Sequence, residues 1–170
     1  MIILEGPDNT GKSTLAESLT LKLDWPVIHP GGKPANQAEE LRMILHQLKL
    51  SKEDIIHDRV TCISQPVYNV FRDDAIDLSY RFYLDEMLKN PNCVIVYCRP
   101  PKWKILDLAT HEAKAHDSPE HLKMITDNAV HILSEYDKMF ETIPHVKYDY
   151  TVDTIESLLE RLNDLSRNPQ

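Results

Sequence analysis

The feature that most constrains this chain is the unbroken run GPDNTGKST at residues 6–14, which fits the pattern G-x-x-x-x-G-K-[ST]. Residues 1–5 before it are typical of a short buried strand, and leucines recurring every fourth residue after it predict a helix from Lys12. Gly6 and Gly11 let the backbone curl so that N–H groups point inward, toward phosphate oxygens. A chance match is disfavoured, because strand and helix stand where the mechanics of the motif require them. The sequence therefore predicts binding of a nucleoside triphosphate.

Each polar position of the motif has an expected role. Lys12 can reach the β- and γ-phosphates, and the hydroxyl of Ser13 is placed to ligate the Mg²⁺ bound to them. ATP and Mg²⁺ are therefore the expected cofactors. The residues expected to bind the ATP phosphates are Asn9, Thr10, Gly11, Lys12, Ser13 and Thr14.

Length and charge narrow the function further. A chain of 170 residues with 42% hydrophobic residues can bury one good core, so we expect a single domain over residues 1–170. A net charge of −8 argues against a general nucleic-acid binder and favours a small-molecule substrate. Three cysteines without a C-x-x-C pair suggest neither a disulfide scaffold nor a zinc site. No apolar run approaches about 18 residues, so we expect no membrane span and a cytoplasmic location.

Strand and helix patterns alternate along the whole chain. Strands are expected at 1–5, 27–29, 54–59, 92–98 and 145–150, and helices at 12–23, 37–48, 61–71 with an interruption at Pro66, 76–88, 104–109, 122–140 and 154–165. This alternation predicts an α/β fold, a three-layer sandwich with a central parallel sheet of about five strands and helices on both faces.

An acid and a base stand together at the end of the third expected strand. Asp58 could hold Mg²⁺ through water or take a proton from an attacking oxygen, and Arg59 could grip an anionic acceptor or the migrating phosphoryl group. As an isolated dipeptide this would usually be a surface ion pair. Its place after a strand that follows the phosphate loop favours the functional interpretation.

Aromatic residues downstream allow a base-binding slot. Tyr68, Phe71, Tyr80 and Phe82, with an arginine among them, could stack on a nucleobase and reach its carbonyls. Most such aromatics are simply core, and the pattern alone leaves both interpretations open.

Residues 109–123 are polar and without clear periodicity, as expected of a lid that closes over a triphosphate and excludes water. The cation expected to act there is Lys114. A solvated connection between helices is an equal alternative for each residue taken singly.

Three motifs together resemble the thymidylate kinases. The first is residues 4–14, the second is residues 30–32 (Pro-Gly-Gly) followed by Arg42, and the third is Asp58-Arg59 followed by Ser64 and Tyr68. Deoxynucleoside kinases share part of the last pattern. The resemblance implies a P-loop kinase fold and a homodimer.

The resemblance also implies residue roles. The acid matching Asp8 faces the acceptor sugar, the arginine matching Arg59 binds the acceptor phosphate, and the acid matching Asp58 lies near the metal. The expected catalytic set is Lys12, Asp58, Arg59 and Lys114, with Ser13 and Asp58 for the metal. The expected acceptor-binding set is Asp8, Arg59, Tyr68, Phe71, Arg72 and Arg81.

The chain also departs from that family. Ile28 and His29 stand where members commonly carry Arg-Glu, and residues 109–123 contain no arginine. Lysine is a weaker, non-bidentate clamp. Arg72 or Arg81 would then have to supply the second contact with the acceptor. These departures fit a compact, divergent enzyme such as phages encode, which would act in the host cytoplasm, or a changed acceptor.

Three functions follow. The first is ATP- and Mg²⁺-dependent phosphoryl transfer to dTMP or a related pyrimidine deoxynucleoside monophosphate. The second is transfer to a hydroxyl, either of a deoxynucleoside or of a hydroxymethylated pyrimidine (5-hydroxymethyluracil) in phage DNA. The third is a P-loop protein that binds nucleotide for regulation and has little turnover.

Two surface patterns would separate the acceptors. A DNA acceptor predicts a basic group beside the cleft, whereas a free nucleotide predicts a closed pocket lined by Tyr68, Phe71 and Arg72. The expected basic group is Lys33, Arg99, Lys102 and Lys104.

Overall fold

A computed structural model describes residues 1–30, 33–73, 75–76, 78–107 and 119–167. Five parallel strands form one sheet in the order β2-β3-β1-β4-β5. The strands are β1 (Ile2–Glu5), β2 (Val27–Ile28), β3 (Ile56–Asp58), β4 (Val94–Cys98) and β5 (Val146–Tyr148). The helices of the described residues are α1 (Lys12–Leu23), α2 (Gln37–Leu50), α3 (Thr61–Asn69), α4 (Tyr80–Leu88), α5 (Lys102–Leu106), α6 (Pro119–Phe140) and α7 (Ile155–Arg167).

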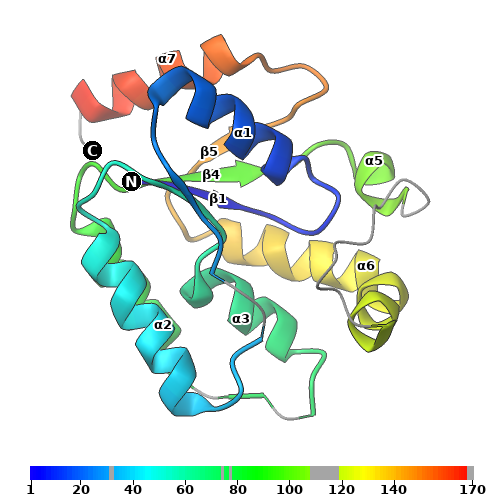
Figure 1. Ribbon diagram of the computed structural model, residues 1–170. Coiled ribbons are helices and arrows are strands. Elements are labelled where there is room, and N and C mark those ends of the chain that lie inside the picture. The colour runs from blue at the N-terminus through cyan, green and yellow to red at the C-terminus, as the bar shows by residue number, and fades with distance from the viewer. Residues whose placement is uncertain (31–32, 74, 77, 108–118, 168–170) are drawn as a thin grey trace.

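Helices cover both faces of the sheet (Figure 1). Helices α1 and α7 lie on one face, and α2, α3 and α6 lie on the other. The alternation of side chains along β1 follows from this arrangement, because successive residues of a strand point to opposite faces. Ile3 packs into the core under α3, α4 and α6, whereas Ile2 and Leu4 pack against α1 and α7. The expected three-layer α/β fold with a five-stranded parallel sheet is thus confirmed.

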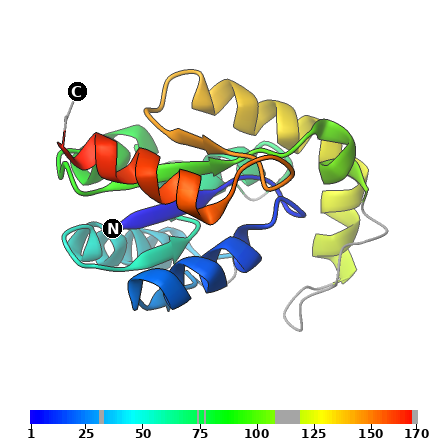
Figure 2. The same cartoon turned by 90° about the horizontal axis from the view of Figure 1, so that it is seen from above.

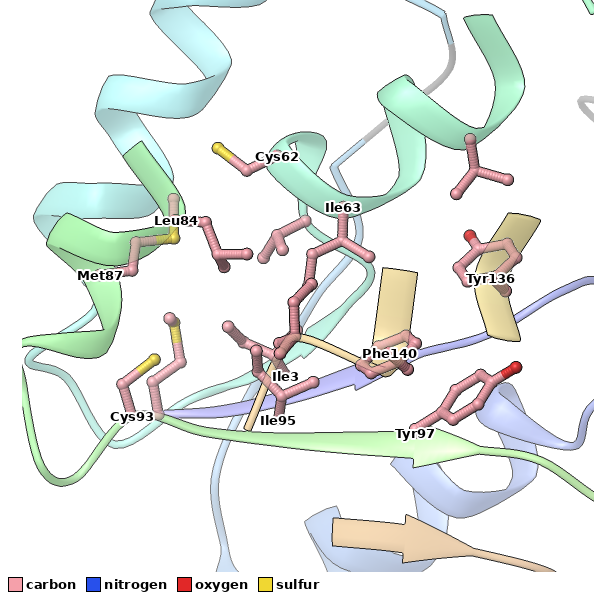
Figure 3. Close-up of a cluster of buried hydrophobic side chains, with 14 of the residues drawn as sticks. Ile3, Cys62, Ile63, Leu84, Met87, Cys93, Ile95, Tyr97, Tyr136 and Phe140 are labelled. Carbon is pink, nitrogen blue, oxygen red and sulfur yellow. The ribbon is translucent and has the colours of Figure 1, made fainter. Parts of the chain in front are cut away.

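The larger core lies between the sheet and the α3–α6 layer (Figure 3). Ile3 and Ile95 form its floor, and an aromatic group closes the end near the phosphate loop. In that group the rings of Tyr97 and Phe140 stack with centroids 4.0 Å apart. The stack ties β4 to the last turn of α6 and fixes the edge of the sheet beside the site.

Several element boundaries differ from those expected. Helix α4 begins at Tyr80 rather than near residue 76, because the carbonyl of Ile76 accepts hydrogen bonds from the side chains of Asn69 and Tyr80 instead of continuing a helix. Helix α3 runs through Pro66, where an interruption was expected. A proline removes one helical hydrogen bond there without ending the helix.

Parallel strands bring their carboxyl ends to one edge of the sheet. The view from above shows the loops that follow β1, β4 and β5 at that edge, together with α5 (Figure 2). Of the expected lid, only residues 119–123 fall within the described part of the chain, where they form the first turns of α6. Among the described helices, none combines the length and apolar character needed to cross a membrane.

Candidate active site

The phosphate loop is held by its own backbone. Lys12, which is only 7% exposed, donates from Nζ to the carbonyl of Gly6 at 2.9 Å, to the carbonyl of Pro7 and to Oγ1 of Thr10 at 3.1 Å. The Thr10 hydroxyl in turn donates to the carbonyl of Pro7 at 2.9 Å. Burial and the neighbouring Arg59 lower the pKa of Lys12 to about 8. The ammonium group sits among the loop carbonyls, where burial disfavours its charge.

Two glycines are required by this geometry. Gly6 has φ +142°, and a Cβ there would lie 2.6 Å from the carbonyl oxygen of Cys98 at the end of β4. Gly11 has φ +77°, precedes α1, and would place a Cβ 3.0 Å from the ring of Tyr150. Loop and sheet edge thus approach more closely than any side chain would allow.

Asp8 joins the loop to the element that follows β3. One carboxylate oxygen accepts from Arg59 Nη2 at 2.8 Å, and the other accepts from the Tyr68 hydroxyl at 2.7 Å. Burial alone would raise the pKa of Asp8, but the charges of Arg59 and Lys12 and the bond from Tyr68 outweigh it and hold that pKa well below its usual range. Asp8 is therefore a fixed anion that neutralises the guanidinium beside it.

Arg59 is placed by its backbone as well as by Asp8. Its N–H donates to the carbonyl of Leu4 at 2.9 Å, and its φ of 77° lies in the left-handed region that an arginine rarely adopts. The guanidinium also lies over the ring of Tyr68, 5.4 Å from its centroid. This backbone turn directs the side chain from the end of β3 toward the phosphate loop.

Glu5, expected only as the end of a strand, is fully buried and binds groups from other parts of the fold. Its carboxylate accepts from the N–H of Val60 at 2.7 Å, from the N–H of Gly6 and from the hydroxyl of Tyr136, both at 3.4 Å. Burial raises its pKa to about 7, against the opposing effects of those bonds and of Arg59. Glu5 thereby links β1, α3 and α6 beneath the loop. An acid that ends an apolar strand directly before a phosphate loop was the signal that sequence reasoning passed over.

Asp58 lies at the carboxyl end of β3 with a side chain 6% exposed. Its Oδ2 is 3.2 Å from Nδ1 of His29, whose side chain is 62% exposed. Ile28 pairs with His57 in the register of β2 and β3, so the next residues along, His29 and Asp58, are neighbours at the edge of the sheet. Two strands that are distant in sequence create this pair, which the sequence pattern alone did not indicate.

The expected acceptor side comprises Asp8, Arg59, Tyr68, Phe71 and Arg72, of which the last three lie on α3 or just after it. Arg72 donates to Oε1 of Gln65 at 2.7 Å, and its guanidinium lies 5.6 Å from the centroid of the Tyr68 ring. Phe71 is partly buried against the larger core. The structure thus brings Tyr68 and Arg72 together, with Gln65, which the sequence analysis did not name, bonded to Arg72, whereas Phe71 packs against the core.

Other expected site residues lie elsewhere. Asn9 turns toward α5, where its side-chain amide donates to the carbonyls of Lys104 and Asp107, both at 3.0 Å. Arg81 bonds Asp85 and the hydroxyl of Thr142, which precedes β5 and so lies toward the opposite end of the sheet. The structure thus does not bring Arg81 to the acceptor side. Lys114 lies outside the described residues.

Two members of the expected basic group, Arg99 and Lys104, are engaged with other side chains. Arg99 is held by two bonds to Asp137, at 2.8 and 3.0 Å, and lines a cavity of about 440 Å³ between α6 and β5 rather than the phosphate loop. The Lys104 ammonium lies over the ring of Trp103, 4.6 Å from its centroid.

The residues at the loop fit a metal ion that is held chiefly by phosphate oxygens. Across the described ranges, no three His, Cys, Asp or Glu side chains gather as a metal site of their own. Ser13 stands in the first turn of α1, and the charge of the buried Asp58 carboxylate acts on Lys12, where it partly opposes the lowering of the Lys12 pKa by burial and by Arg59. Mg²⁺ in kinases typically takes one or two protein ligands and completes its shell with phosphate and water.

Comparisons with known proteins place this fold. No protein-family model matches the chain. A prophage-derived protein of Bacillus subtilis, YorR, is 30% identical over 103 residues, which cover 59% of this chain and 62% of that relative. The crystal structure of YorR, in complex with phosphorylated GDP, matches 98% of this chain and 95% of its own with a TM-score of 0.70 and 21% identity.

Two further solved structures share the architecture. Deoxyadenosine kinase of M. mycoides matches 96% of this chain and 98% of its own, with a TM-score of 0.53 and 18% identity. Thymidylate kinase of Candida albicans matches 98% of this chain and 90% of its own, with a TM-score of 0.51 and 17% identity. The chain therefore has the fold of P-loop kinases. The likeness does not single out the thymidylate kinases, because kinases of other acceptors match equally well.

Proposed function

We propose that this protein is a kinase that transfers the γ-phosphoryl group of ATP to a nucleoside or nucleotide. The observation that carries the proposal is the convergence of Lys12, Asp58 and Arg59 at one edge of the sheet. The bond from the Arg59 N–H to Leu4 fastens the end of β3 to β1, so the Asp-Arg pair lies beside the phosphate loop. Phosphoryl transfer needs positioning and charge neutralisation more than covalent help, and this group can supply both.

ATP and Mg²⁺ fit the residues at the loop. Gly6 and Gly11, both with positive φ, shape the loop between β1 and α1, and Lys12 binds carbonyl and hydroxyl oxygens that phosphate oxygens would replace on binding. Ser13 and Asp58 would hold Mg²⁺. When bound, the ion would neutralise charge on the phosphates.

A pyrimidine deoxynucleoside monophosphate such as dTMP is the acceptor that the sequence resemblance favours. In that case Arg59 would bind the acceptor phosphate, Asp8 would face its sugar, and Tyr68 with Arg72 would hold its base. The contact between the Arg72 guanidinium and the Tyr68 ring, 5.6 Å from its centroid, supports a base site near these two residues.

A hydroxyl acceptor is the second candidate, and two observations favour it. Arg59 is already neutralised by Asp8 at 2.8 Å, the nearby Arg72 is bonded to Gln65, and Arg81 bonds Asp85 and Thr142 instead of reaching this side. At the same edge, the exposed imidazole of His29 lies 3.2 Å from the buried Asp58 carboxylate. Such an acceptor would be a deoxynucleoside, or 5-hydroxymethyluracil in DNA.

The test is transfer of label from γ-labelled ATP, with Mg²⁺, to a panel of acceptors. The panel holds deoxynucleosides, deoxynucleoside monophosphates, and DNA with or without 5-hydroxymethyluracil. GTP is included as a second donor because YorR was crystallised with phosphorylated GDP. Transfer to any member supports a kinase and names its acceptor class. Nucleotide binding without transfer to any of them would overturn the proposal in favour of a regulatory nucleotide-binding protein.

A further inference from the structure

The side chain of Asn9 ties the phosphate loop to helix α5. Its amide nitrogen Nδ2 donates to the carbonyls of Lys104 and Asp107, both at 3.0 Å. Lys104 belongs to the last turn of α5, and Asp107 is the residue that caps this helix at its C-terminal end. The last carbonyls of a helix have no partner within the helix, and a side-chain amide carries two hydrogens to donate. Asn9 therefore caps α5 from a position 95 residues before Lys104.

Helix α5 has little else to hold it in place. It is only five residues long, and among those five Ile105 alone is buried. Trp103 is 64% exposed although its side chain is large and apolar. A helix of this length is not stable by itself in water, so its position depends on contacts with the rest of the fold. The two bonds from Asn9 are such contacts, at the same edge of the sheet where the phosphate loop lies (Figure 2).

The same bonds restrain the backbone of the loop. Asn9 has a φ of 60°, in the left-handed region that asparagine adopts more readily than most residues with a Cβ. A loop that binds phosphate needs its N–H groups fixed toward the ligand. With its side chain fastened to α5, residue 9 has less freedom to leave the conformation that the loop requires.

The Asn9 bonds differ from those made by Lys12 in what nucleotide binding would do to them. Lys12 binds the carbonyls of Gly6 and Pro7 and the hydroxyl of Thr10, oxygens that phosphate would replace. The side chain of Asn9 binds carbonyls of α5 and no group of the loop among these. The link to α5 can therefore remain while the bonds inside the loop are exchanged.

We infer that Asn9 is a positioning residue that couples ATP binding in the phosphate loop to the docking of α5. This inference rests on the nucleotide-binding part of the proposed function. The bonds to α5 keep the loop in its phosphate-binding shape and so strengthen ATP binding. Because a coupling free energy between two sites is reciprocal, ATP in the loop must hold α5 in place more firmly by the same factor.

The first measurement is the Kd for ATP of Asn9→Gly, by isothermal titration calorimetry with Mg²⁺. Glycine adopts a φ of 60° without strain, so this variant removes the two bonds and leaves the loop conformation accessible. The loss of two hydrogen bonds should raise the Kd about 10-fold. Asp24→Gly is the matched control, because Asp24 is exposed, has a φ of 58° and follows α1. It should keep the Kd of the unaltered protein.

The second measurement is hydrogen exchange at the amides of Lys104 and Asp107, which donate to the carbonyls of Pro101 and Trp103. In the unaltered protein, saturating ATP should slow this exchange by about the same 10-fold factor. In Asn9→Gly, ATP should change it by no more than about twofold. A purely structural role of Asn9 would speed exchange in the variant but leave the effect of ATP intact.

The outcomes separate this inference from the proposed function, because both measurements are made without an acceptor. An unchanged Kd for ATP in Asn9→Gly, or equal slowing of exchange by ATP in the two proteins, would overturn the role of Asn9 and leave the kinase intact. If the coupling is found but the unaltered protein transfers phosphate to no acceptor, the proposed function fails and the role of Asn9 stands. Failure of the unaltered protein to bind ATP would overturn both.

Discussion

In the phosphate loop Lys12 and Thr10 bind the loop's own backbone, whereas Asp8 and Arg59 join parts of the chain that are distant in sequence. Lys12 reaches carbonyls five and six residues before it. Asp8 instead meets residues 51 and 60 positions away. The first arrangement forms wherever the loop sequence follows a strand. The second exists only once the sheet has set β3 beside β1, so it depends on the tertiary fold.

The difference shows in the charges. In the loop, one buried lysine sits among carbonyls, ready to exchange them for phosphate oxygens. On the acceptor side, Arg59, Asp8 and Tyr68 already bind one another, although Nε of Arg59 is buried without a hydrogen-bond partner among the described residues. We therefore expect substitutions in the loop to abolish activity, and substitutions on the acceptor side to alter acceptor choice first.

The largest effect is expected for Lys12→Ala. Losing the cation that would face the γ-phosphate should lower kcat at least about 10²- to 10³-fold, measured by transfer of label from ATP. Lys22→Ala, at an exposed position in the same helix that pairs with Glu156, is the control and should keep full activity. Near-normal turnover in Lys12→Ala would contradict both the kinase assignment and the contrast between the phosphate loop and the acceptor side.

Gly6→Ala should break the loop through its backbone. The added Cβ would meet the Cys98 carbonyl at 2.6 Å, at a φ that alanine tolerates poorly. We expect a loss of about 3 kcal/mol in the free energy of unfolding, measured by urea denaturation, together with loss of ATP binding. An unchanged denaturation midpoint would show that the loop and β4 can separate without cost.

Glu5→Gln tests the buried carboxyl group that links β1 to α3 and α6 beneath the phosphate loop. The folded protein raises the pKa of Glu5 to about 7 from its ordinary 4.5, so the native state holds this proton more tightly than the unfolded state. Glu5 therefore costs stability progressively as pH rises from 4.5 to 7, by at most about 3 kcal/mol. The glutamine variant should gain stability relative to the unaltered protein over that interval. Urea denaturation at several pH values measures the difference.

The Glu5→Gln variant must be compared with the unaltered protein at each pH, because His57 also makes stability depend on pH. Burial lowers the pKa of His57 to about 4, so its contribution to stability rises with pH over nearly the same range. That contribution is common to both proteins and cancels in the difference. A difference that stays constant between pH 4.5 and 7 would mean that Glu5 is not protonated in the native state.

Tyr68→Phe should weaken the acceptor side with a smaller effect. It removes the hydroxyl bonded to Asp8 and keeps the ring beneath Arg59 and Arg72. We expect a loss of about 1 to 2 kcal/mol in stability and a larger rise in the KM for the acceptor than in that for ATP. Tyr83→Phe, on α4, is the control. Equal changes in both KM values would show that Asp8 contributes as much to ATP binding as to acceptor binding.

The same contrast explains what could be predicted from the sequence. The loop is one contiguous motif with fixed mechanics, so its residues were named together, and the alternation of elements predicted the sheet. The His29–Asp58 pair depends on which strands are neighbours, and the Gln65–Arg72 bond depends on how the chain turns after α3. Neither follows from periodicity.

Glu5 was missed for another reason. Strand patterns treat a terminal acid as the end of burial, whereas here three donors make a fully buried carboxylate acceptable. The expected roles of the acceptor residues stay predictions, and that of Lys114 concerns a residue outside the described part of the chain.

The smallest effect is expected for Arg81→Ala, which separates sequence resemblance from position. The sequence suggested a second acceptor contact at this arginine, but its side chain is 57% exposed and pairs with Asp85 one helical turn away. Removing such a pair should change stability by about 0.5 kcal/mol or less and leave the KM for every acceptor unchanged. Arg72→Ala, measured in parallel, should raise the acceptor KM because Arg72 lies against Tyr68. A rise in the acceptor KM for Arg81→Ala comparable to that for Arg72→Ala would mean that α4 moves toward the acceptor when substrate binds. Residues of α4 would then belong to the acceptor side.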